Sequence, residues 1–272
     1  MVKFEPEQHI YTSVKESDAI KWISVTSVLK KFKEPFDTER IASKSAKNEK
    51  SKWFGLSSKE IQDIWKKEAD RACDLGNFYH DQREADILEC ETLDRYGATL
   101  PVISPMEDEH GTKVAPSQKL IKGIYPEHLC YLRSAGVCGQ SDLVEVVNGY
   151  VHITDYKTNK EIKQKSFVNW EGISKKMLTP LNHLDDCNYN HYNLQLSIYM
   201  YIILKHNPKL KPGNIVISHV IFEENGKDKY DYPISKLDNN GNPIVKEVVR
   251  YDMPYLKEEV IQMLKEFKPI KK

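Results

Sequence analysis

The chain has 272 residues, 40% of them hydrophobic and 10% aromatic, a composition that supports one sizeable core and excludes a disordered chain. Forty basic and forty acidic residues cancel, which excludes a uniformly basic nucleic-acid-binding protein and leaves a local patch for such a partner. No apolar run approaches the ~20 residues needed to cross a bilayer, and the amino terminus lacks the apolar core of a signal peptide. We therefore expect a cytoplasmic protein without a membrane partner.

The five cysteines form no CxxC pair and are odd in number. These features argue against a disulfide framework and against a zinc knuckle. We expect buried, reduced thiols at Cys73, Cys90, Cys130, Cys138 and Cys187.

The first 96 residues are predicted to be mainly helical after a short hairpin of "FEPEQHIY" and "IKWISV". Ser24 or Thr26 can cap a helix through "SVLKKF", and Asp37 can cap the next helix, "TERIASKSAKNEK". Ser57 stands three residues before Glu60, the spacing of a capping box. Apolar residues at helical spacing follow, so we expect one long helix over residues 57–96.

Residues 97–116 are rich in proline, glycine and charge, and we interpret them as an excursion between elements. A short helix "SQKLIKGI" is predicted next, then a strand "EHLCYLRS", and later a helix "NYNHYNLQLSIYMYIILKH". Strands "GNIVISHVIFE" and "KEVVRYDM" and a final helix "YLKEEVIQMLKEF" complete the chain. We divide this single domain into a core at 117–222 and carboxyl-terminal strands and helix at 223–272.

The stretch "GQSDLVEVVNGYVHITDYKTNK" at residues 139–160 predicts a β-hairpin. Its Asn148-Gly149 pair favours a two-residue turn, so counting outward from that turn places Asp142 directly opposite Asp155. Opposed residues have Cβ atoms about 4.5–5.5 Å apart, and like charges there repel one another. A divalent cation would relieve that repulsion.

The same face of the hairpin carries Lys157 and an apolar wall formed by Val144, Val146, Val151 and Ile153. Oxygen ligands suit magnesium or manganese, and a lysine beside such a metal can orient water and stabilise charge on a phosphoryl oxygen. The pattern indicates metal-assisted phosphodiester hydrolysis. The alternative is a charged strand end, with Asp142 solvated and Asp155 paired to Lys157.

The glycine before the first aspartate, the D-x12-D-x-K spacing and "ITDYKTNK" at the end of the second strand resemble the central motif of the PD-(D/E)XK nucleases, in their RecB-type exonuclease branch. Gly76 and His80 in "LGNFYHDQRE" resemble the branch's metal-binding helical motif. Glu127 resembles the acidic residue before the first core strand. Gln195 and Tyr199 resemble its Q-x-x-x-Y motif, in which an amide and a phenol contact DNA phosphate or hold the catalytic lysine.

Each of these residues also has a structural alternative. A lone histidine such as His80 is more often packed or solvated, Glu127 can begin a surface strand, and Gln195 and Tyr199 lie in a helix that is apolar throughout. Ser24 and Thr26 resemble a helix start near the entrance of related exonucleases, although helix capping explains them as well.

A basic segment follows the hairpin, "KTNKEIKQKSFVNWEGISKKM". Lysines can contact successive phosphates while aromatic rings stack on unpaired bases, which favours a DNA-binding surface. A solvated lysine-rich surface is an equally good interpretation. The residues that we assign to DNA are Lys160, Lys163, Lys165 and Trp170.

The resemblance implies a restriction-endonuclease-like α/β core, in which a mixed β-sheet is flanked by helices and a helical amino-terminal region shapes a DNA channel. It implies Mg²⁺, with Mn²⁺ able to substitute, bound by Asp142, Asp155, the carbonyl of Tyr156 and His80, while Glu127 lies nearby and Lys157 positions water. Many relatives also carry an iron-sulfur cluster, but no cysteine follows Cys187, so we expect none here.

The implied activity is that of a DNA exonuclease on single-stranded ends, serving end processing, recombination, repair or replication. A structure-specific or nonspecific endonuclease and a catalytically silent DNA-binding or assembly module are the alternatives. The chain lacks a GxxxxGK[ST] loop, so a helicase or recombination protein would be a separate partner. Short nucleases of this kind occur in phages, which would place the protein in the host cytoplasm; the oligomeric state is left open.

Overall fold

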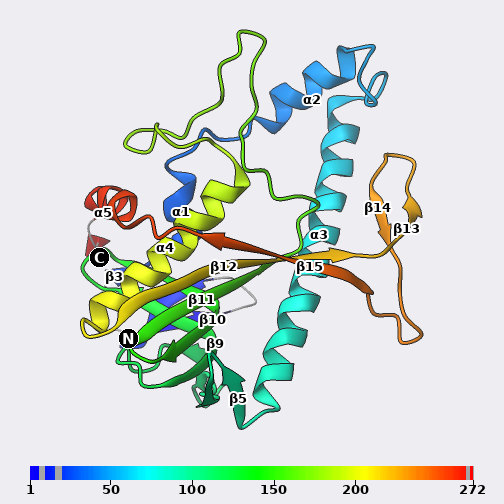
Figure 1. Ribbon diagram of the computed structural model, residues 1–272. Helices are drawn as coiled ribbons and strands as arrows, with labels where there is room; N and C mark the ends of the chain where they lie inside the picture. The colour runs from blue at the N-terminus through cyan, green and yellow to red at the C-terminus, as the bar shows by residue number, and fades with distance from the viewer. Residues whose placement is uncertain (6–9, 16–19, 268–269, 272) are drawn as a thin grey trace.

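The computed structural model describes residues 1–5, 10–15, 20–267 and 270–271. Across these residues the fold is mixed α/β, with several sheets and five helices (Figure 1). The helices are α1 (Val25–Lys30), α2 (Thr38–Lys47), α3 (Ser58–Leu88), α4 (Asn188–His206) and α5 (Lys257–Lys265). The mixed α/β class predicted from the sequence is confirmed.

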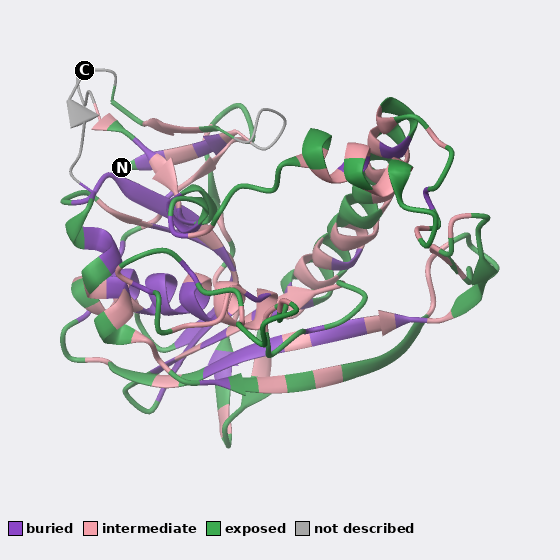
Figure 2. Ribbon diagram, turned by 90° about the horizontal axis from the view of Figure 1, so that it is seen from above, coloured by how far each residue is buried: buried purple, intermediate pink, exposed green. Residues whose placement is uncertain are grey.

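The main sheet has six strands and both parallel and antiparallel pairs. Its strands are β4 (Ile23–Ser24), β9 (Gly123–Leu132), β10 (Val137–Val147), β11 (Tyr150–Lys157), β12 (Lys211–Phe222) and β15 (Val245–Met253). Strands β9, β10 and β11 form an antiparallel meander, α4 crosses over to β12, which runs parallel to β11, and β15 returns antiparallel. Figure 2 shows that the later part of β12 is largely buried, whereas the edge strand β15 is mostly exposed.

Four smaller sheets lie around the main one. A four-stranded sheet combines β1 (Val2–Glu5), β2 (Ile10–Ser13), β7 (Met106–Glu107) and β8 (Lys113–Val114). The others are the pairs β5 (Thr92–Arg95) with β6 (Ala98–Pro101), β13 (Glu224–Lys227) with β14 (Pro233–Ser235), and β3 (Ile20–Lys21) with β16 (Ile270–Lys271).

The two faces of the main sheet are covered differently. Helix α4 is apolar along most of its length and packs with α1 and α5 on the face that carries Val144, Val146 and Ile153. The other face receives α3, which runs crosswise to the strands, and the β5–β6 hairpin (Figure 1). Strands β10 and β11 therefore lie between α4 on one face and α3 on the other.

The central hairpin forms in the predicted register. Val147 pairs with Tyr150 around the Asn148-Gly149 turn, and both turn residues adopt the positive φ that a two-residue turn requires, 51° and 81°. The predicted apolar wall is buried in the main core. The caps at Ser24, Asp37 and Ser57 are also formed, the last with Glu60 as a capping box.

Three local predictions are wrong. The long helix ends at Leu88, because Tyr96 and Gly97, with φ of 50° and 72°, turn the following residues into the β5–β6 hairpin. Residues 97–116 are not simply an excursion, since they contain β6, β7 and β8. The first hairpin forms between β1 and β2, whereas "IKWISV" splits into β3 and β4, which pair with β16 and β10.

The helix predicted for residues 117–124 is also absent. The side chain of Asn207 accepts a hydrogen bond from the backbone of Leu120 and donates one to the carbonyl of Gln118, while the Gln118 amide donates to Leu129. These tertiary bonds take the place of helical ones, and β9 begins at Gly123.

Among the cysteines, Cys130, Cys138 and Cys187 are buried as expected, whereas Cys90 is half-buried. Cys73 is exposed, because its position on α3 lines an open cavity. All five are free thiols. None of the described helices combines the length and apolar character that a bilayer span requires. The cytoplasmic location stays a prediction.

Candidate functional site

The two hairpin aspartates lie in the middle of β10 and near the carboxyl end of β11. Leu143 pairs with Thr154, and one further step along both strands places Asp142 opposite Asp155. Asp142 Oδ2 accepts a 2.7 Å hydrogen bond from the backbone N–H of Tyr156. Asp155 is 1% exposed and forms an ion pair with Lys157.

Glu127 enters the same site from the neighbouring strand β9. The pairs His128 with Ser141 and Pro126 with Leu143 flank it, so its register partner is Asp142. Its backbone adopts a φ of +48°, which is uncommon for a side-chain-bearing residue within a strand and costs about 1–3 kcal/mol. Three carboxylates thus lie side by side on three adjacent strands, and the middle one is Asp142.

His80 reaches these carboxylates from α3. Its Nδ1 lies 3.3 Å from Asp142 Oδ2, and its Nε2 lies 3.0 Å from the carbonyl oxygen of Tyr156. Gly76, one turn earlier, permits the approach, because a Cβ there would lie 3.3 Å from Thr158 Oγ1. Ligand atoms of His80, Glu127 and Asp142 all lie within 4.8 Å of one another, close enough for one cation to bind all three.

Burial and mutual repulsion set the protonation of this cluster. Burial raises the pKa of Glu127, and the charge of Asp142 raises it further. The pKa of Asp142 is raised by burial and then by Asp155. Burial alone would lower the pKa of Lys157, but Asp155 and Asp142 outweigh burial and the pKa is raised, so the ammonium form persists.

Lys157 has a second neighbour that sequence reasoning missed. The ring of Tyr192 on α4 lies 5.1 Å from Lys157 Nζ, within cation–π range. The Tyr192 hydroxyl donates a 2.6 Å hydrogen bond to Asn159 Oδ1. A tyrosine in a helix rich in tyrosine gives no sequence signal of this contact, which depends on how α4 packs on the sheet.

A cavity of about 580 Å³ opens beside the cluster and brings together most of the remaining predicted residues. The site residues that line it are Ser24, Thr26, His80, Glu127, Gln195 and Tyr199. The Gln195 amide donates a 3.3 Å hydrogen bond to the Tyr199 hydroxyl. Tyr199 packs on Gly139, where an added Cβ would lie 2.8 Å from the ring. Lys113 and Glu84 also line the cavity and were not predicted.

The structure does not bring the predicted lysine patch to this cavity. Lys160, Lys163, Lys165 and Trp170 lie in an exposed segment between β11 and α4, with Trp170 91% exposed. Lys163 pairs with Glu161. Farther along, Lys175 and Lys176 pair with Asp186 and Asp185. The local positive charge is therefore smaller than the lysine count indicates, and the assignment of this segment to DNA stays a prediction.

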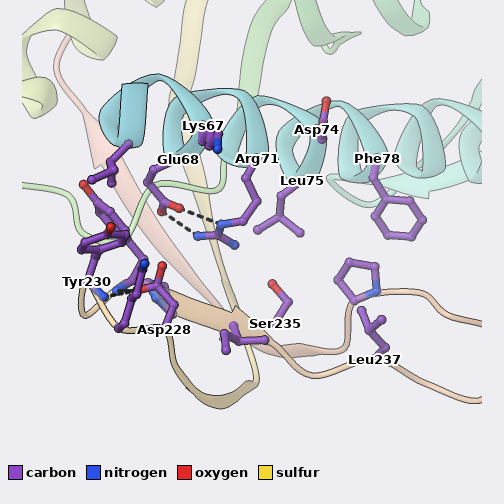
Figure 3. Close-up of a pocket in the computed structure, with 16 residues that line it drawn as sticks. Lys67, Glu68, Arg71, Asp74, Leu75, Phe78, Asp228, Tyr230, Ser235 and Leu237 are labelled. Atoms are coloured by element: carbon purple, nitrogen blue, oxygen red, sulfur yellow. Dashed lines mark hydrogen bonds and ion pairs between the residues drawn. The ribbon is translucent and has the colours of Figure 1, made fainter. Parts of the chain in front are cut away.

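A larger cavity, about 640 Å³, lies between α3 and the β13–β14 hairpin (Figure 3). Leu75 and Phe78 of α3 face Ser235 and Leu237 across it, and Glu68 binds Arg71 along its wall. None of the predicted catalytic or metal-binding residues lines this cavity. Size alone therefore does not locate the candidate site.

Comparison of the chain with protein-family models, with curated proteins and with solved structures found no match.

Proposed function

We propose that this chain is a metal-dependent nuclease of the PD-(D/E)XK type, which hydrolyses phosphodiester bonds in DNA. The observation that carries the proposal is the convergence of His80, Glu127 and Asp142 from three separate elements, beside the buried pair of Asp155 and Lys157. A mixed sheet with helices on both faces and with carboxylates on the adjacent strands β9, β10 and β11 supports a restriction-endonuclease-like core.

The residues present fit a hard divalent cation. The carboxylates of Glu127 and Asp142 converge with one imidazole, and the Tyr156 carbonyl lies beside that imidazole. Burial and the neighbouring carboxylates raise the pKa of Glu127 and Asp142, so the cluster gains from a bound positive charge. We propose Mg²⁺, with Mn²⁺ able to substitute, held by His80, Asp142, Asp155 and Tyr156, with Glu127 completing the site. When bound, such an ion supplies Lewis-acid stabilisation of charge on the phosphoryl group.

The chain's own residues have separable roles in this proposal. Lys157, held between Asp155 and the Tyr192 ring, orients the attacking water and stabilises the developing negative charge. The backbone N–H of Tyr156 fixes the Asp142 carboxylate. Gln195 and Tyr199 contact the phosphate backbone from the cavity wall.

The proposed form of the activity is an exonuclease acting on DNA ends. A cavity of about 580 Å³ has the size of an ordinary ligand pocket, roughly 300–1,000 Å³, and accommodates nucleotides of one strand rather than a duplex. A helicase or recombination protein that opens the duplex is the proposed partner, because a strand end must be supplied to the site.

The test uses linear end-labelled single- and double-stranded DNA and closed circular single-stranded DNA, each with Mg²⁺. We expect the wild type to release label from linear strands and to leave circles intact, while Asp155→Asn, a near-isosteric control, releases nothing. Cleavage of circles would instead show an endonuclease. Tight DNA binding without cleavage in both Mg²⁺ and Mn²⁺ would contradict the proposal and favour a silent module.

A further inference from the structure

The cavity beside the candidate metal site has a marked charge imbalance. Three acidic side chains line it, namely Asp81, Glu84 and Glu127. Among the described residues that line it, Lys113 is the single lysine or arginine. A nucleic acid strand carries one negative charge per nucleotide, so a strand that enters this cavity needs cationic partners in addition to a metal.

Lys113 lies on β8, which pairs with β1, and its side chain lines the cavity. Its Nζ lies 2.8 Å and 3.1 Å from the two carboxylate oxygens of Glu84, one turn beyond His80 on α3. The two side chains are 22% and 20% exposed, so the pair belongs to the cavity wall. An ammonium group has three donors, and a single carboxylate leaves at least one of them for a ligand.

The positive charge of Lys113 acts on Glu127, one of the residues of the candidate metal site. Among the charges that act on Glu127, Asp142 and Glu84 raise its pKa, whereas Lys113 opposes them. Lys113 is therefore within electrostatic range of the carboxylates that would bind the metal.

We propose that Lys113 binds a non-scissile phosphate of the substrate strand, using the ammonium donor that its ion pair with Glu84 leaves available. This inference rests on the proposed nuclease function and adds a second anion-binding position to it. Lys113 is a binding residue in this account, so its loss weakens substrate binding more than it slows the chemical step.

A purely structural ion pair that joins β8 to α3 makes a different prediction. In that case Lys113→Met and Glu84→Gln would have the same consequences, since each removes the same contact. If Lys113 binds phosphate, the two variants diverge, because Glu84→Gln leaves the lysine in place and removes a negative charge from the cavity.

The experiment measures kcat and KM for an end-labelled single-stranded oligodeoxynucleotide with Mg²⁺ over a series of salt concentrations. The variants are Lys113→Met, Lys113→Arg and Glu84→Gln. Lys236→Met is the control, since it removes a lysine from a more exposed ion pair with Glu223 outside this cavity. Melting temperatures of all variants report on folding.

For Lys113→Met we expect KM to rise about tenfold, kcat to stay within about twofold, and the slope of log KM against log salt to fall by about 0.7, the value of one lost phosphate contact on a single strand. Lys113→Arg, Glu84→Gln and Lys236→Met should show neither the higher KM nor the reduced slope. A wild type that cleaves, together with a Lys113→Met variant of unchanged KM and slope, would overturn this inference alone. Equal increases in KM for Lys113→Met and Glu84→Gln would also overturn it. A wild type that cleaves no DNA would remove the proposed function as well.

Discussion

Replacing Lys157 with methionine is expected to lower kcat for DNA cleavage by about a hundred- to a thousandfold, with KM within about threefold of the wild type. Methionine keeps much of the apolar stem but removes the charge that acts on the phosphoryl group. Because the lysine contacts the reacting group and not the remote strand, the loss should appear in the chemical step. Steady-state kinetics on a labelled single strand measure both parameters.

The loss of Lys157 has a second consequence that supplies its control. Asp155 is 1% exposed, and removing its partner leaves a buried, uncompensated charge that costs about 3–5 kcal/mol. The double variant Lys157→Met/Asp155→Asn should therefore melt at a higher temperature than Lys157→Met. Because Asp155→Asn is expected to be inactive by itself, the melting temperature is the readout of this control, and a double variant that melts no higher than Lys157→Met would contradict the buried-charge account.

Replacing Asp142 with asparagine is expected to abolish Mg²⁺-dependent cleavage and to stabilise the metal-free protein by about 1 kcal/mol at neutral pH. Asparagine can still accept the hydrogen bond from the Tyr156 backbone, since its side-chain oxygen occupies the same position as Asp142 Oδ2. It brings no charge into a cluster in which burial and Asp155 raise the pKa of Asp142.

The sign of the pH dependence follows from that raised pKa. The folded state prefers the protonated carboxyl, so the wild type loses stability as pH rises from the ordinary aspartate value, about 4, to the raised pKa. The asparagine variant does not lose stability over this pH range. In EDTA, the melting temperatures of the wild type and the variant should therefore converge below about pH 4. Added Mg²⁺ should stabilise the wild type and leave the variant unchanged. A metal-free variant that melts lower at neutral pH would contradict the electrostatic account.

The sequence predicts the central hairpin well because its register depends on local chemistry. Asn148 and Gly149 supply the positive φ of the turn, and the alternating valines decide which face is buried. Once that register is fixed, the relation of Asp142 to Asp155 and Lys157 follows by counting. The convergence of His80 and Glu127 on Asp142 agrees with what the family resemblance implies.

Other parts of the site depend on tertiary packing and carry no local signal. Glu127 reaches the cluster because its backbone in β9 adopts a strained, positive φ. The neighbouring residues in the sequence give no signal of that conformation. The sequence pattern around Lys113 predicts an irregular segment, whereas in the structure β8 pairs with β1 and Lys113 lines the cavity. Tyr192 contacts Lys157 only because α4 crosses over this end of the sheet. The turn at Tyr96 and Gly97 was missed because the preceding helical pattern gives no clear end.

The most direct test of the central claim is a manganese-soaked crystal measured for anomalous scattering, with Asp142→Asn as the matched control. We predict a peak in the wild type among His80, Glu127, Asp142 and Asp155, and its loss in the variant. An empty cluster at a manganese concentration that supports cleavage would contradict the account.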